Sequence, residues 1–189
     1  MTERLTFSAS VEVRATPAEV FALISDLREK APLNPNIQVI RVELDGEEPI
    51  REGSVFYHRF QRGSRIVEYR TRCVRYEPPR RFVTRGQTDP PFEVDVTVEP
   101  RPGGSRLTQR ETVEAGPERL DALDAVPPGG RLFLDALELL VFFPGGRRLG
   151  AELRAHQRDR VARRLAGELA EWLEAVRRHL ERGREAGGR

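Results

Sequence analysis

The first element that the sequence predicts is a β-strand over residues 6–14. Apolar residues occupy every second position there, as Phe7, Ala9, Val11 and Val13, and polar residues stand between them. This period of two puts one face against a core and the other toward water. The same period recurs between residues 37 and 115, in segments separated by turn-forming Gly and Pro residues. We therefore predict further strands over 37–44, 54–61, 65–76, 81–87, 92–99 and 105–114.

Between the first two strands, the pattern predicts a short helix. Thr16 can cap its N-terminus, Pro17 suits the first helical position, and Glu19 completes a capping box. The residue before a proline avoids the helical region, so the helix should end before Pro32. We expect a second short helical turn before a connector over residues 31–36.

The C-terminal part of the chain predicts one long amphipathic helix over residues 147–183. Its apolar residues recur mostly four apart and form one stripe: Leu149, Leu153, Val161, Leu165, Leu169, Leu173, Val176 and Leu180. A sheet with one apolar face needs a cover, and this helix supplies it. We expect the tail, residues 184–189, to fray.

The segment 65–76 leaves its register open. One face carries Val67, Tyr69, Thr71 and Cys73, and the other carries Ile66, Val74 and Tyr76. We place Tyr69 and Thr71 inside, because the opposite register would bury three charged residues. A β-bulge midway would switch the register along the strand.

Length and composition limit the class of protein. The chain has 189 residues, 38% of them hydrophobic and 33% charged, which fits one globular domain over 1–189 with a substantial core. No apolar run approaches the roughly 20 residues that cross a bilayer. The N-terminus has no secretory pattern, so we expect a cytoplasmic protein.

Metal, cofactor and nucleic-acid sites lack a sequence signal. The three histidines are scattered, and Cys73 is the only cysteine, which we interpret as a small buried hydrophobe. We therefore expect neither a metal nor a cofactor. Of the 32 basic residues, 31 are Arg, a bias that we attribute to coding composition. Arg and Glu interleave along the C-terminal helix, which favours ion pairs on a solvated face over nucleic-acid binding.

The segment 116–146 is an apolar insertion between the sheet and the long helix. Residues 132–143 contain only two charged residues and are too short to cross a membrane. Three interpretations stay open: a helix buried against the sheet, a homodimer contact, or a helix on a membrane surface. The long helix is a second candidate for a homodimer contact.

Five motifs stand in order along the chain, at residues 11–21, 25–27, 52–56, 76–82 and 103–108. Together they resemble the helix-grip fold of the START/SRPBCC superfamily, in its polyketide cyclase/dehydrase and lipid-transport branch. The likeness covers about residues 6–115 and the last helix. The resemblance implies an α+β fold, in which a curved antiparallel sheet of about seven strands, with two short helices after the first, wraps around the long C-terminal helix. It also implies an elongated apolar cavity between the sheet and that helix.

Alternation then selects the residues that face such a cavity. Placing Phe56 and Phe60 inside also turns His58 inward, and the last strand turns Gln109 and Glu111 inward. We take His58, Glu111 and Tyr69 as candidate proton donors and acceptors. The full set of candidate ligand-binding residues is Phe56, His58, Phe60, Tyr69, Thr71, Phe92, Val94, Val96, Gln109, Glu111 and Leu165. Trp172 could close one end of the cavity or simply pack in the core.

Three functions follow as alternatives. The first is binding of a hydrophobic small molecule, such as a lipid, quinone or polyketide, in the internal cavity. The second is a polyketide cyclase or dehydratase that uses the inward acid and base groups. The third is an interaction or membrane-surface protein that acts through residues 132–143.

Overall fold

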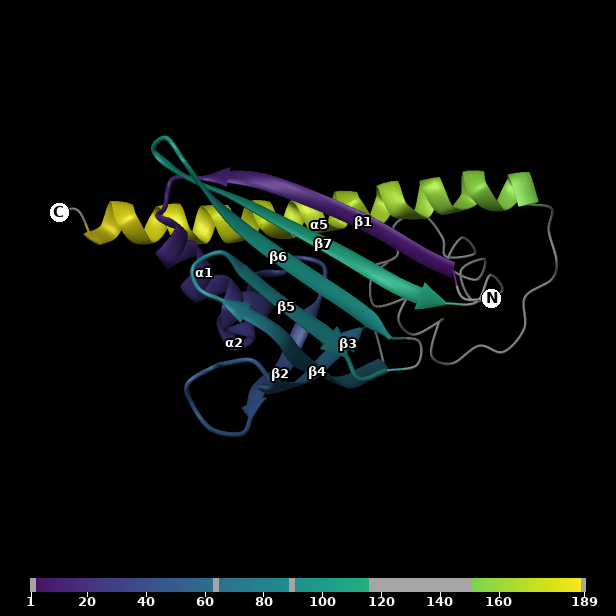
Figure 1. The fold of residues 1–189 in the computed structure, drawn as a ribbon, viewed down its shortest axis with the longest axis horizontal. Helices are drawn as coiled ribbons and strands as arrows, with labels where there is room; N and C mark the ends of the chain where they lie inside the picture. Colours follow the sequence, from purple (N-terminus) through teal and green to yellow (C-terminus); the bar gives the residue numbers. More distant parts are fainter. Residues whose placement is uncertain (1–2, 63–64, 89–90, 116–150, 188–189) are drawn as a thin grey trace.

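Seven antiparallel strands form one curved sheet in the computed structural model, which describes residues 3–62, 65–88, 91–115 and 151–187 (Figure 1). The order across the sheet is β1-β7-β6-β5-β4-β3-β2. The strands are β1 (Glu3–Val13), β2 (Gln38–Asp45), β3 (Val55–Arg62), β4 (Arg65–Glu77), β5 (Arg81–Gly86), β6 (Phe92–Arg101) and β7 (Gly104–Ala115). The seven-stranded antiparallel sheet predicted from alternation is confirmed.

Short helices carry the chain from β1 at one edge of the sheet to β2 at the other. They are α1 (Pro17–Ser25), α2 (Leu27–Lys30) and the 3₁₀ turn η1 (Ala31–Leu33). The capping box forms as predicted: the Glu19 amide donates to the Thr16 hydroxyl, and the Glu19 carboxylate accepts from the Thr16 amide. Asp26 has an extended backbone that ends α1, and its carboxylate accepts from the Arg28 amide, so it caps α2.

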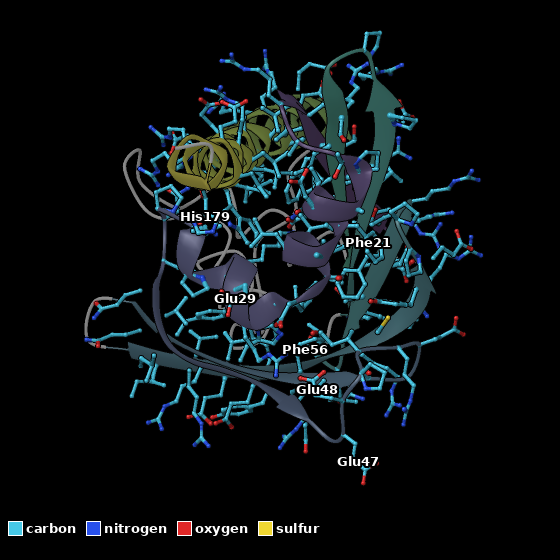
Figure 2. All side chains as sticks on the ribbon, turned by 90° about the vertical axis from the view of Figure 1, so that its left-hand side faces the viewer. Phe21, Glu29, Glu47, Glu48, Phe56 and His179 are labelled. Atoms are coloured by element: carbon cyan, nitrogen blue, oxygen red, sulfur yellow. The ribbon has the colours of Figure 1, made fainter. Side chains whose placement is uncertain are left out.

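The long helix α5 (Ala151–Gly187) packs along the inside of the sheet next to β1 (Figure 1). Its buried side chains follow the predicted stripe: Val161, Leu165, Leu169, Leu173 and Val176. In the view along α5, the sheet curves around the short helices (Figure 2). Phe21 and Phe56 lie inside this curve, and Glu47 lies outside it. Leu149 and the side chain of Leu153 lie outside the described part of the chain.

The register of β4 changes where the sequence left the choice open. The pairing of β4 with β5 shifts between Cys73 and Arg75. The shift allows Thr71 and Cys73 to be buried and still lets Tyr76 turn inward, where it meets the rings of Phe21 and Phe82 edge-on. A β-bulge therefore turns Tyr76 inward after Thr71 and Cys73, whereas Ile66, which precedes the shift, stays 52% exposed.

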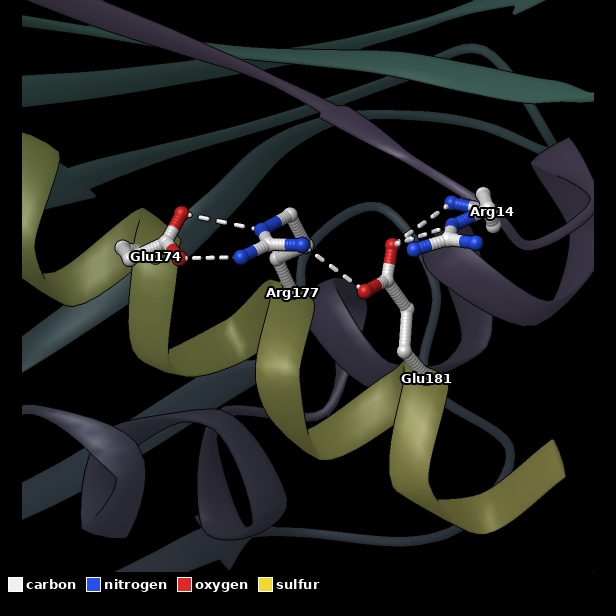
Figure 3. Close-up of polar contacts among 4 residues, drawn as sticks. All are labelled: Arg14, Glu174, Arg177 and Glu181. Carbon is white, nitrogen blue, oxygen red and sulfur yellow. Dashed lines mark hydrogen bonds and ion pairs between the residues drawn. The ribbon is translucent and has the colours of Figure 1, made fainter. Parts of the chain in front are cut away.

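Polar contacts fasten the C-terminal end of α5 to the end of β1 (Figure 3). The Arg14 amide donates to Glu181 Oε1 at 3.1 Å, and Arg177 Nη1 donates to Glu181 Oε2 at 2.8 Å. Arg177 also pairs with Glu174, one turn earlier on the helix. The predicted ion pairs between helical turns are thus present, and they help to fix the long helix against the strand where the short helices begin.

The apolar insertion, residues 116–146, lies outside the described residues, so the interaction hypothesis for 132–143 stays a prediction. Among the helices that are described, none has the length and apolar character needed to span a membrane.

Candidate functional site

A polar cluster lies on the inner face of the sheet, among buried apolar side chains. Alternation along β7 turns Gln109 and Glu111 inward, and both are almost fully buried. On one side they face Ala9 and Phe7 of β1 across the ladder. On the other side they face valines of β6. The sequence therefore predicted the inward direction of these two polar groups correctly.

The cluster includes a residue that the sequence did not point to, Lys30. It is the last residue of α2 and only 1% exposed. Its Nζ donates to Gln109 Oε1 at 2.5 Å and lies 4.7 Å from the centre of the Trp172 ring. The indole Nε1 of Trp172 donates to the Lys30 carbonyl oxygen at 3.3 Å, so α5 holds the end of α2 in place.

Gln109 connects the amine to an acid. Its Nε2 donates to Glu111 Oε1 at 2.5 Å, so one carboxamide binds both Lys30 and Glu111. Burial raises the pKa of Glu111 above its usual range, against the opposing effects of Gln109 and Lys30. Burial likewise lowers the pKa of Lys30, and the charge of Glu111 only partly offsets it. Both groups are therefore drawn toward their neutral forms near neutral pH.

The second carboxyl oxygen of Glu111 has no hydrogen-bond partner, although it is buried. Most buried polar atoms in proteins are paired, because an unmade hydrogen bond costs about 1–3 kcal/mol. An unpartnered carboxyl oxygen in this position therefore indicates a place where a further polar group can bind.

His58, Thr71 and Tyr69 form a second polar group on β3 and β4. His58 Nε2 and the Thr71 hydroxyl are 2.9 Å apart, and the His58 ring stacks on Tyr69 with centroids 4.8 Å apart. Burial lowers the pKa of His58 to about 4, so the ring is neutral near pH 7, and its Nδ1 has no partner. Burial, and then the charge of Glu111, raise the pKa of Tyr69 above its usual range.

The candidate apolar residues divide between two clusters of the core. Phe56, Phe92, Val96 and Leu165 belong to the main one, and partly buried Val94 packs against it. Phe60 instead packs with Ala31 in a smaller cluster. Partly buried Tyr69 contacts both clusters.

Other chemistry has little support among the described residues. They contain no group of three or more residues that could hold a metal ion. Cys73 is buried, as expected, and donates from Sγ to the Arg75 carbonyl oxygen. Burial raises the pKa of its thiol to about 11, so it is a poor nucleophile near neutral pH.

A curved antiparallel sheet around a long C-terminal helix makes this a helix-grip protein. Residues 4–140 match the model of the family described as polyketide cyclase / dehydrase and lipid transport. The chain therefore belongs to that family, and the resemblance seen in the sequence is confirmed. No curated protein sequence matches the chain.

Solved structures share the fold at low sequence identity. A Staphylococcus aureus protein of unknown function superposes with a TM-score of 0.69 at 8% identity, covering 97% of this chain and 98% of that one. The di-domain ARO/CYC StfQ of the steffimycin biosynthetic pathway gives 0.63 at 16% identity, and the match covers 97% of this chain and 52% of StfQ. A point mutant of norcoclaurine synthase from Thalictrum flavum, in complex with a transition-state analogue, gives a TM-score of 0.54 at 17% identity. That match covers 75% of this chain and 96% of the synthase.

Proposed function

We propose that this protein binds a hydrophobic small molecule between the sheet and α5, with a polar group of the ligand at Glu111. The single observation that carries this function is the unpartnered, buried Oε2 of Glu111 inside an apolar core. Membership of a family described by lipid transport and polyketide cyclisation supports a lipid, quinone or polyketide-like ligand.

Energetics supports a binding role for this cluster. Burying an amine, a carboxamide and a carboxyl group is a weak source of stability, since desolvation offsets most of the attraction. Apolar contacts with residues such as Phe56, Phe92 and Leu165 would supply most of the affinity, at about 25 cal/mol per Å² of ligand surface buried. A hydroxyl donor on the ligand would pair with Glu111 Oε2 and fix the orientation.

A pair of matched probes tests this function. β-Naphthol and β-methylnaphthalene have nearly the same shape, but only the first can donate a hydrogen bond. We expect the wild type to bind β-naphthol about tenfold more tightly, which corresponds to one good hydrogen bond of about 1.4 kcal/mol. Equilibrium dialysis measures both affinities.

Two variants show which residue provides the preference. Glu111→Leu should bind the two probes equally, whereas the exposed-surface variant Arg182→Lys should keep the wild-type preference. Equal affinities of the two probes for the wild type, or a preference that survives in Glu111→Leu, would contradict the proposed site.

Polyketide cyclisation or dehydration is a second candidate function. The observation in its favour is the pairing of a buried acid and a buried amine through Gln109, both with pKa values shifted toward neutrality. Such a pair can both give and take a proton near pH 7. A cyclase would release a product with a new ring, and a dehydratase would release a product lighter by one water. A binding protein would release the ligand unchanged.

A further inference from the structure

Lys30 has a combination of properties that a structural lysine rarely has. It is the only lysine of the chain, since the other 31 basic residues are Arg. Its amine is buried, and its one hydrogen-bond acceptor among the described residues is the neutral Gln109 carboxamide. No carboxylate of the described residues lies within ion-pair distance of Nζ. An ammonium has three N–H donors, so most of its hydrogen-bonding capacity is unused here.

These surroundings raise the fraction of neutral amine above that of an exposed lysine. Removal from water destabilises the charged form, and the attraction of Glu111 and of the Trp172 ring compensates only partly. A neutral amine can still donate one N–H to Gln109 while its nitrogen lone pair remains free. Arginine could not do this, because its guanidinium stays protonated in proteins.

We propose that Lys30 is a nucleophilic amine that forms an imine with a ketone or aldehyde group of the bound hydrophobic ligand. Nζ attacks the carbonyl carbon, a C–N bond forms, and the carbonyl oxygen takes a proton to give a carbinolamine. The C–O bond then breaks and one water leaves. Both hydrogens of that water come from the amine, so the step needs no oxidant or reductant.

Glu111 is the group that moves these protons. It lies at the opposite end of the same carboxamide as Lys30, one hydrogen bond from Gln109 on each side. Its unpartnered Oε2 can give a proton to the leaving oxygen and receive one from the nitrogen. This inference rests on the proposed binding function and defines the ligand further, as a hydrophobic compound that carries a carbonyl group.

Benzoylacetone, an aromatic β-diketone, tests the amine directly. Its imine rearranges to a conjugated enaminone that absorbs in the near ultraviolet and needs no reductive trapping. We expect the full chain to gain the mass of one diketone less one water, and peptide mapping to place the adduct on Lys30. An ordinary lysine is neutral in fewer than about one molecule in a thousand at pH 7, so Lys30 should react at least about tenfold faster than an exposed lysine.

The chain offers a matched control because it has no other lysine. Arg182→Lys adds one exposed lysine to α5, and the two rates are then compared within one protein. Lys30→Met should give no internal adduct, and circular dichroism checks that it is folded. Mapping separates Lys30 from the N-terminal amine, the other amine of the chain.

The outcomes separate this inference from the proposed function. Benzoylacetone that dialysis shows to be bound, but that leaves Lys30 unmodified, would overturn the imine and leave the binding function standing. If Lys30 reacts no faster than the introduced lysine, the imine proposal is likewise overturned and the binding function stands. If benzoylacetone neither binds nor reacts, the imine is overturned, and binding of β-naphthol decides whether the binding function fails with it.

Discussion

Lys30→Met is expected to lower the free energy of unfolding by about 3 kcal/mol, and an all-apolar replacement of the cluster is expected to recover that loss. The single variant leaves Gln109 Oε1 without its donor and Glu111 without the nearby amine of Lys30. The triple variant Lys30→Met/Gln109→Leu/Glu111→Leu removes all three polar groups at similar volume. Urea unfolding of both variants and of the wild type measures the effect.

The triple variant distinguishes a functional cluster from a structural one. We expect it to be at least as stable as the wild type, but to bind β-naphthol no better than β-methylnaphthalene. A triple variant less stable than Lys30→Met would mean that the cluster contributes to the fold itself, which would remove the energetic reason for assigning it to a ligand.

In the wild type, His58 should make the free energy of unfolding fall by as much as about 3 kcal/mol between pH 6.5 and pH 4. We expect His58→Gln to remove this part of the fall. Burial lowers the pKa of His58 from 6.5 to about 4, so in this range the unfolded chain binds the proton more readily than the folded one. The contribution of His58 to stability is therefore full above pH 6.5 and is lost as the pH falls toward 4. Glutamine keeps a partner for the Thr71 hydroxyl but does not titrate.

The comparison of the two pH profiles isolates His58. The raised pKa of Glu111 acts in the opposite direction, because its contribution is full below its unfolded value and is lost as the pH rises. Glu111 is present in both proteins, so its effect cancels to a first approximation in the difference. Urea unfolding at a series of pH values gives both profiles. Parallel profiles for the wild type and His58→Gln would show that the ring is solvated and not buried as described.

Much of the fold could be predicted from the sequence because it depends on local patterns. The alternation of a strand and the Thr16 capping box each involve residues close together in the chain, and the structure confirms the strands and the box. The inward direction of His58, Gln109 and Glu111 follows from the same alternation, once the apolar face of each strand is known. The break at Asp26, which separates α1 from α2, lies within residues 25–27, one of the five motifs of the family resemblance.

Lys30 could not be predicted from local pattern. A lysine at the end of a four-residue helix, two residues before Pro32, usually lies in solvent. Its burial here depends on Trp172, which is far away in sequence. One signal was nevertheless present, since a chain that otherwise uses only Arg keeps a single Lys. We attributed that bias to coding composition alone. That interpretation does not explain Lys30, the one exception to the bias. A lysine amine can become neutral in the core, whereas an arginine guanidinium cannot.

Native mass spectrometry of the freshly purified protein, followed by organic extraction, shows whether its interior holds a hydrophobic ligand. We expect a population heavier than the 21.5 kDa chain by one small molecule, and an extract that contains an apolar compound with a hydroxyl or carbonyl group. If the protein keeps the mass of the chain alone, both as purified and after equilibration with β-naphthol, the interior binds no such ligand and the proposed binding function is wrong.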